Sequence, residues 1–155
     1  MKAGFHLAGA VIFLGAIGCY QPDPELSPPP PPQFEADVGE AEGTEFRDQV
    51  PRVLTRNSFE LEDRNEPPSP RVRTGWLPRD PFPDEREVGA DAARTRVVVR
   101  GIPVRDSSKY LVTVLVLNEI RFTESTTWME IEATPLFTEY ADGITRALAA
   151  GIHGG

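Results

Sequence analysis

The stretch KYLVTVLVLN (Lys109–Asn118) decides the fold, because apolar side chains stand at both odd and even positions along it. Successive side chains of a β-strand point to opposite faces of the sheet. A strand that is apolar on both sides belongs in the middle of a sheet, with both faces shielded from water. We therefore expect Lys109–Asn118 to be the central strand.

The residues before this stretch predict a neighbouring strand and a turn. Thr95–Gly101 reads TRVVVRG, and its three consecutive valines favour a short strand. Pro103 then prevents a regular continuation, and Asp106, Ser107 and Ser108 are typical turn residues. An antiparallel pair of strands is expected on either side of this turn.

The residues after the central strand predict two further strands. Glu119–Glu124 alternates polar and apolar side chains, and Ser125-Thr126 predicts a turn. Thr127–Thr134 also alternates, so that three side chains point to the core and two point outward: Met129, Ile131 and Ala133 inward, Glu130 and Glu132 outward. Together these strands predict an antiparallel β-meander.

A C-terminal amphipathic helix is expected to cover this sheet. Thr134 is a suitable N-cap and Pro135 suits the first helical position, while Gly151 is a natural C-cap. Apolar residues recur at helical spacing at Leu136, Phe137, Tyr140, Ile144, Ala147 and Leu148. Residues 95–155 are thus predicted to form a small α+β domain, which is marginal on its own and needs additional apolar partners.

Residues 19–94 have the composition of a spacer. Of the 16 prolines in the chain, 14 lie between Pro22 and Pro83, and Pro28–Pro32 is an uninterrupted run that favours polyproline II. The segment is also acidic and poor in apolar residues, so it cannot bury enough apolar surface to offset the entropy that is lost when a chain becomes ordered. We expect a long, largely disordered, proline-rich spacer before the domain.

Two apolar patches interrupt the spacer. Val53–Leu61 could form a hairpin or an added edge strand, and the small domain is expected to recruit it. The second patch carries Trp76 and Phe82 among prolines. These two residues either fold back onto the domain or form an interaction peptide that becomes ordered on a partner.

Residues 1–18 are predicted to be an export signal. Lys2 gives the N-terminal region a positive charge, and Leu7–Ile17 is an 11-residue apolar run. About 20 apolar residues are needed to span a bilayer, so this run is too short for a membrane helix and typical of a signal peptide. Small Gly18 then precedes Cys19, the only cysteine of the chain.

The letters AIGC (Ala16–Cys19) resemble the lipobox of bacterial lipoproteins, although Ala16 stands where that family usually has leucine. The resemblance implies cleavage between Gly18 and Cys19 and acylation of Cys19 by diacylglycerol and palmitate-type chains. Several acyl chains anchor a protein firmly to a membrane. Tyr20, in place of an aspartate, implies the outer membrane facing the periplasm. The alternative is an ordinary leader that leaves Cys19 as a free thiol.

A second, shorter resemblance lies within the spacer. RDPF (Arg79–Phe82) is similar to a motif of the lipid-anchored assembly protein of type IV pilus machines, which also combines a lipobox, a proline-rich spacer and a small β domain. The resemblance covers four residues. It implies an accessory lipoprotein of a pilus or secretion machine as a remote alternative.

Catalytic and cofactor chemistry finds little support. After the leader the only histidine is His153, which is expected in a solvated tail, and Glu130 and Glu132 are better explained as the outer face of a hairpin than as paired catalytic carboxylates. We expect no metal, no cofactor and no enzymatic activity. A formal net charge of −8 also disfavours a nucleic-acid partner.

The sequence thus predicts a lipid-anchored envelope lipoprotein that presents a small domain to a protein partner or envelope assembly. The alternative is a module in which sheet and helix enclose a site for lipid, sugar or peptidoglycan.

Overall fold

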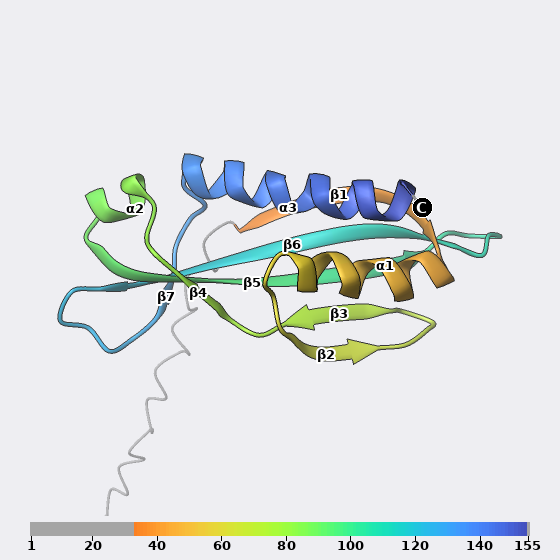
Figure 1. Cartoon of the computed structure of the whole chain (residues 1–155), viewed down its shortest axis with the longest axis horizontal. Coiled ribbons are helices and arrows are strands. Elements are labelled where there is room, and N and C mark those ends of the chain that lie inside the picture. Colours follow the sequence, from red (N-terminus) through yellow and green to blue (C-terminus); the bar gives the residue numbers. More distant parts are fainter. Residues whose placement is uncertain (1–32, 155) are drawn as a thin grey trace, which may run out of the picture.

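The computed structural model describes residues 33–154, in which seven strands and three helices form one body (Figure 1). Residues 1–32, which include the predicted leader and the start of the predicted spacer, lie outside the described part. In chain order the elements are β1 (Phe34–Glu42), α1 (Gly43–Arg56), β2 (Leu61–Asn65), β3 (Arg71–Thr74), β4 (Leu77–Arg79), α2 (Pro83–Glu87), β5 (Ala90–Pro103), β6 (Lys109–Phe122), β7 (Met129–Glu130) and α3 (Pro135–His153).

The strands form one antiparallel sheet in the order β1-β6-β5-β3-β2, with β4 paired to β5 and β7 paired to β6. The predicted α+β class, with an antiparallel sheet and a C-terminal helix, is confirmed. The predicted central strand is also confirmed, because β6 lies between β1 and β5 and its Val112, Val114 and Val116 are fully buried.

The predicted antiparallel meander is present, because β5, β6 and β7 pair in chain order, but its strand bounds differ from the prediction. Glu119–Phe122 continues β6 instead of starting a new strand, because nothing in the sequence turns the chain at Asn118 and Glu119 still pairs with Arg94 of β5. The predicted strand at Thr127–Thr134 is reduced to Met129–Glu130, and Met129 is exposed. The partner of β6 on its other side is β1, from the far end of the described chain.

The predicted boundary at residue 94 is also wrong, because residues 33–94 are folded. The segment contributes β1 to β4 and two helices, and α1 buries Phe46, Val50, Val53 and Leu54 at helical spacing. Phe59 is buried as well, so the Val53–Leu61 patch is recruited to the core as expected, as a helix end and not as a hairpin. Residues 19–32 of the predicted spacer lie outside the described part.

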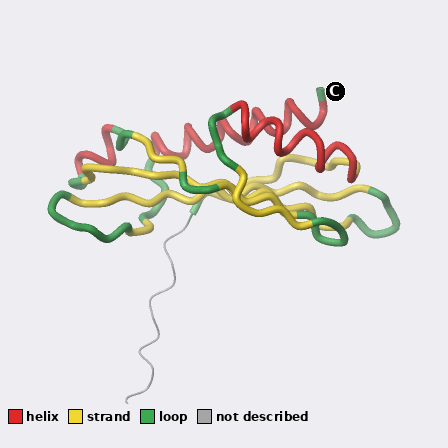
Figure 2. The backbone as a smooth tube through the Cα atoms, turned by 60° about the horizontal axis from the view of Figure 1, so that its bottom comes forward, coloured by secondary structure: helices red, strands yellow, loops and turns green. Residues whose placement is uncertain are grey.

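One face of the sheet is covered and the other is open. The helices lie on the same side of the strands (Figure 2), and α1 and α3 pack against each other there. Between helices and sheet lies the main core, to which α3 contributes Phe137, Ala141, Ile144, Leu148 and Ile152. We call the side with the helices the covered face and the opposite side the open face.

The long helix α3 begins as predicted and ends later. The Thr134 hydroxyl accepts a hydrogen bond from the backbone N–H of Phe137 (3.3 Å), and Pro135 occupies the first turn. The predicted C-cap at Gly151 is wrong, because the helix runs on to His153. Gly151 instead allows α1 to approach closely, since a Cβ at this position would overlap Cγ2 of Val53.

Candidate interaction surface

The structure separates the two aromatic residues singled out in the sequence. Trp76 lies on the open face just before β4, whereas Phe82 lies on the covered side at the start of α2. Both are partly buried and fold back onto the domain. The other predicted site residues, Gly18 and Cys19, lie outside the described residues.

On the covered face, Phe82 belongs to a buried polar network around Arg79. The Arg79 guanidinium donates to both carboxylate oxygens of Glu85 (2.6 and 2.7 Å), and the Glu85 side chain is fully buried. Asn118 links to both charged partners, and Thr95 accepts from Arg79 Nε (3.0 Å). The guanidinium also lies 4.1 Å from the Phe82 ring centroid, a cation–π distance.

The network keeps Glu85 ionised. Burial by itself would raise the pKa of Glu85, but hydrogen bonds from Arg79, the Phe82 backbone N–H and Asn118, together with the Arg79 charge, lower the pKa below its usual value. Burial raises the pKa of the neighbouring Tyr140, and the Arg79 charge offsets part of that rise. The RDPF motif thus has a structural role in this chain, because Arg79 and Phe82 fix α2 against the sheet.

The open face carries a different arrangement of arginines, alternating with tryptophans. The Arg94 guanidinium lies 4.6 Å from the Trp76 ring centroid and 4.3 Å from that of Trp128. The Arg96 guanidinium lies 4.5 Å from the Trp76 ring centroid, and the Arg121 guanidinium lies 5.4 Å from the Trp128 ring centroid. We call the series Arg96–Trp76–Arg94–Trp128–Arg121 the Arg–Trp ladder.

Each arginine of the Arg–Trp ladder also forms an ion pair with a carboxylate. Arg94 Nε donates to Glu119 (2.6 Å), its cross-strand neighbour, and Arg96 contacts Glu62 of β2 (3.0 Å). Arg121 pairs with Asp91 at 3.4 Å. Because each guanidinium meets both an aromatic ring and a carboxylate, the ladder is a rigid, half-buried surface and not a set of free cations.

Beside the ladder, the open face shows ordered rows across the strands. The first, the Asp37 row, runs across four neighbouring strands from β1 to β3 and consists of Asp37, Thr113, Arg100 and Arg71. The second, the Glu35 row, runs the same way and consists of Glu35, Leu115, Val98 and Arg73. Each row has an acid on β1 and an arginine on β3, and β2 continues the rows with Asn65 beside Arg71 and Asp63 beside Arg73.

A third pair on this face is apolar and exposed. Ile102 pairs with Leu111, and these side chains are 52% and 37% exposed, which ranks them among the exposed large apolar residues of the described chain. Across the open face the strands are thus acidic on β1, mainly apolar on β6, and basic on β5 and β3.

Several charges on the open face lack ion pairs. Within residues 33–154, Glu35, Asp37 and Arg100 form no salt bridge. Arg71 pairs with Asp63 of β2 (2.9 Å), and Glu62 of β2 pairs with Arg73 (3.4 Å) and Arg96 (3.0 Å). The buried Nε–H groups of Arg71 and Arg96 have no hydrogen-bond acceptor. A buried donor without an acceptor is unfavourable. The basic side of the face therefore has hydrogen-bonding capacity to offer to a partner.

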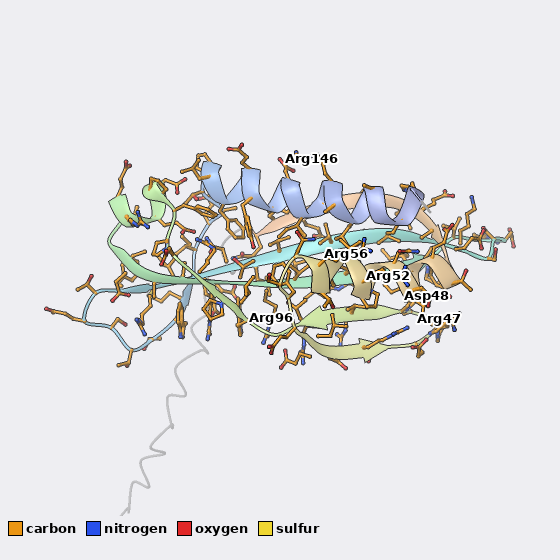
Figure 3. The ribbon with its side chains drawn as sticks, viewed as in Figure 1. Arg47, Asp48, Arg52, Arg56, Arg96 and Arg146 are labelled. Atoms are coloured by element: carbon orange, nitrogen blue, oxygen red, sulfur yellow. The ribbon has the colours of Figure 1, made fainter. Side chains whose placement is uncertain are left out.

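Three further arginines lie on the helices of the covered face and point to solvent. Arg52 and Arg56 lie on the exposed side of α1, and Arg146 lies on the outer side of α3 (Figure 3). They lie apart from the open face and serve below as control positions.

Two surface hollows of about 320 Å³ each lie at one end of the sheet. One is lined by residues of the α1 start and the β5–β6 turn, including Phe46 and Tyr110. The other is lined by Arg71, Arg100 and Ile102, so it borders the basic side of the open face. The space between helices and sheet that the ligand-binding alternative requires is filled by the core.

The remaining candidates are surface residues. Glu130 and Glu132 are both exposed, and only Glu130 belongs to β7. His153 is exposed in the last turn of α3, not in an irregular tail, and it packs beside Gly39, whose φ of +119° creates the bulge in β1. No group of His, Cys, Asp and Glu in residues 33–154 has a metal-binding arrangement.

No helix within the described residues has the length and apolar composition that crossing a membrane requires.

Comparison with known proteins gives no family: no protein-family model matches the chain, and no curated protein matches it in sequence.

The sequence alone does not identify Arg94, Arg96, Arg121 and Trp128 as parts of one surface. A usable signal existed, because Arg94 and Arg96 alternate with buried residues along β5 and so share a face. The aromatic rings between them come from two distant segments, and no periodicity within either segment shows that they meet.

Proposed function

We propose that this protein is a lipid-anchored envelope protein that uses the open face of its sheet to bind another protein. The single observation that carries the proposal is the one-sided covering of the sheet. Every described helix lies on the covered face, while the open face combines exposed apolar Ile102 and Leu111 with fixed arginines and unpaired charges. Specific protein interfaces combine such apolar centres with aromatic and arginine side chains.

The short connection to the proposed anchor supports this reading. The predicted spacer of 19–94 shrinks to residues 19–32, so that Cys19 and Gln33 are 14 residues apart. At most about 3.6 Å per residue, this connection reaches roughly 50 Å. Gln33 is fixed at the edge of the sheet, because its side chain binds the Asn118 N–H and the Ile131 carbonyl. An acylated Cys19 would therefore keep the domain near the membrane, within reach of envelope partners.

The interaction is tested by photo-crosslinking in cells. A photo-crosslinking amino acid replaces Ile102 on the open face, and a matched variant carries it at exposed Arg146 on α3. We expect a discrete protein adduct from position 102 and none from position 146. Equal or absent adducts from both positions would contradict the proposal.

The anchor is tested separately. Labelled palmitate should enter the wild-type protein, and Cys19→Ser should abolish the labelling. Incorporation that persists in Cys19→Ser would refute acylation at Cys19 and leave the open-face proposal to be judged on the crosslinks.

A further inference from the structure

We infer that the open face binds a second copy of this chain, in a face-to-face dimer whose two-fold axis runs parallel to the strands. This inference rests on the proposed function and names the partner. It follows from the distribution of charge on the open face and agrees with the place where the anchor segment joins the sheet.

The charge argument begins with the Asp37 row. A two-fold axis parallel to the strands and between β5 and β6 lays β1 of one copy over β3 of the other. Asp37 then faces Arg71 of the second copy, and Thr113 faces Arg100. Each of these two contacts occurs twice, because the interface of a two-fold dimer uses the same surface on both copies.

The Glu35 row fits the same operation. Glu35 comes to lie over Arg73 of the second copy, whose Nε in the single chain is 3.4 Å from Glu62 of β2. Leu115 comes to lie over Val98, and exposed Ile102 over exposed Leu111. Each row therefore places an acid of one copy against an arginine of the other. Facing sheets pack about 10 Å apart with a small angle between their strands, so rows of this kind meet directly.

The other in-plane axis is excluded by the same charges. A two-fold axis perpendicular to the strands lays β1 over β1, which places Glu35 and Asp37 against their own copies. Like charges that face each other in an interface strongly weaken binding. The charge pattern thus selects one orientation of the second copy.

The anchor agrees with this orientation. Rotation about an axis parallel to the strands leaves the position along the strands unchanged, so both Gln33 residues lie at the same height in the dimer. Each is fixed beside Asn118 by hydrogen bonds. Two acylated Cys19 residues can then reach one membrane from the same height. Confinement of both copies to one membrane also raises their effective concentration.

The test uses the full-length chain in cells, expressed with two different epitope tags, and measures how much of one tag co-purifies with the other. An acid-reversed chain carries Glu35→Lys and Asp37→Lys. A base-reversed chain carries Arg71→Glu and Arg73→Glu, the two arginines that face Asp37 and Glu35. We expect each reversed chain to lose self-association at least tenfold. Mixing the two should restore co-purification, because both contacts of the mixed dimer are again acid against base.

The mixture protects the test against a folding defect, since two misfolded chains do not rescue each other. Arg52→Glu and Arg56→Glu on α1 form the matched control and should leave self-association unchanged. Failure of the mixture to restore the signal, or wild-type self-association in both reversed chains, would overturn the dimer.

The crosslink at position 102 separates this failure from that of the proposed function. An adduct that carries both tags supports the dimer. An adduct that contains only a different protein overturns the dimer and upholds the proposed function, and the absence of any adduct overturns both.

Discussion

Arg79 on the covered face and Arg94 on the open face have the same chemistry and different surroundings. Each forms an ion pair and lies against aromatic rings. Arg79 is 11% exposed and its partner Glu85 is fully buried, whereas Arg94 and Glu119 keep contact with water, at 25% and 13%. The first pair holds the fold together and the second shapes a surface.

The comparison teaches that burial, not the type of contact, decides what an ion pair does. A buried charge that loses its partner is strongly destabilising, while a solvated charge regains hydration. On the covered face every polar group of the network has a partner. On the open face, Arg71 and Arg96 keep buried Nε–H groups without an acceptor, which is where a second molecule can add contacts.

The largest effect is expected from Arg79→Met. This change leaves the Glu85 carboxylate buried and without its charged partner, and we expect a loss of about 3–5 kcal/mol in the free energy of unfolding. Urea denaturation followed by circular dichroism measures it. Arg79→Met combined with Glu85→Leu should recover much of the loss; a double variant no more stable than the single one would show that the charge is not the cause.

Two Leu→Ala substitutions, one on each face, compare the faces without changing any charge. Leu148 of α3 is fully buried in the main core, and Leu148→Ala should cost about 2–5 kcal/mol through lost burial and a cavity. Leu111→Ala on the open face should change the stability of the isolated chain by about 0.5 kcal/mol or less. Chemical denaturation at low protein concentration gives both values. Equal costs would mean that the open face is not a solvent-facing surface.

The pH dependence of stability distinguishes the buried ion pair further. The folded-state pKa of Glu85 is lowered, so its ionised form stabilises the fold above the unfolded carboxyl pKa of about 4.3. This contribution is lost as the pH falls through the lower folded-state pKa. We expect Glu85→Gln to be less stable than wild type at pH 7 and the difference to shrink on acidification. A difference that stays constant down to low pH would contradict the assignment.

A moderate effect is expected on the ladder. Arg94→Leu removes two cation–π contacts and the Glu119 ion pair, at a cost of about 1–2 kcal/mol. Trp76 and Trp128 are the only tryptophans of the chain, so intrinsic fluorescence reports on the ladder alone. The emission should shift in Arg94→Leu and stay unchanged in Arg146→Leu, which lies on the outer side of α3.

The sequence was sufficient where one segment decides its own structure. Lys109–Asn118 is apolar on both sides and became the central strand, and Thr134-Pro135 began a helix. It was misleading where apolar residues are sparse. In α1 only four buried residues stand among charged ones and Pro51, so composition resembled a spacer although their helical spacing forms a core-facing side.

The candidate surface could not be predicted for a different reason. Its rows join residues from β1, β6, β5 and β3, and its ladder joins Trp76 to Trp128 through Arg94. Such neighbours are defined by strand register, which depends on pairing between distant segments. The sequence shows that Trp76 is unusual, because it stands among prolines. The residues that Trp76 contacts depend on the register of β4 on β5, which the sequence does not show.

The pairing of β1 with β6 has a consequence for the time at which this chain folds. About 80 positions separate paired residues such as Phe34 and Val116, and contacts of such long range slow folding. During synthesis, β1 has no strand to join until β6 has emerged, and α3 follows later still. The sheet is therefore completed only when nearly the whole length of the chain is available, and β1 waits unpaired for longer than any other strand.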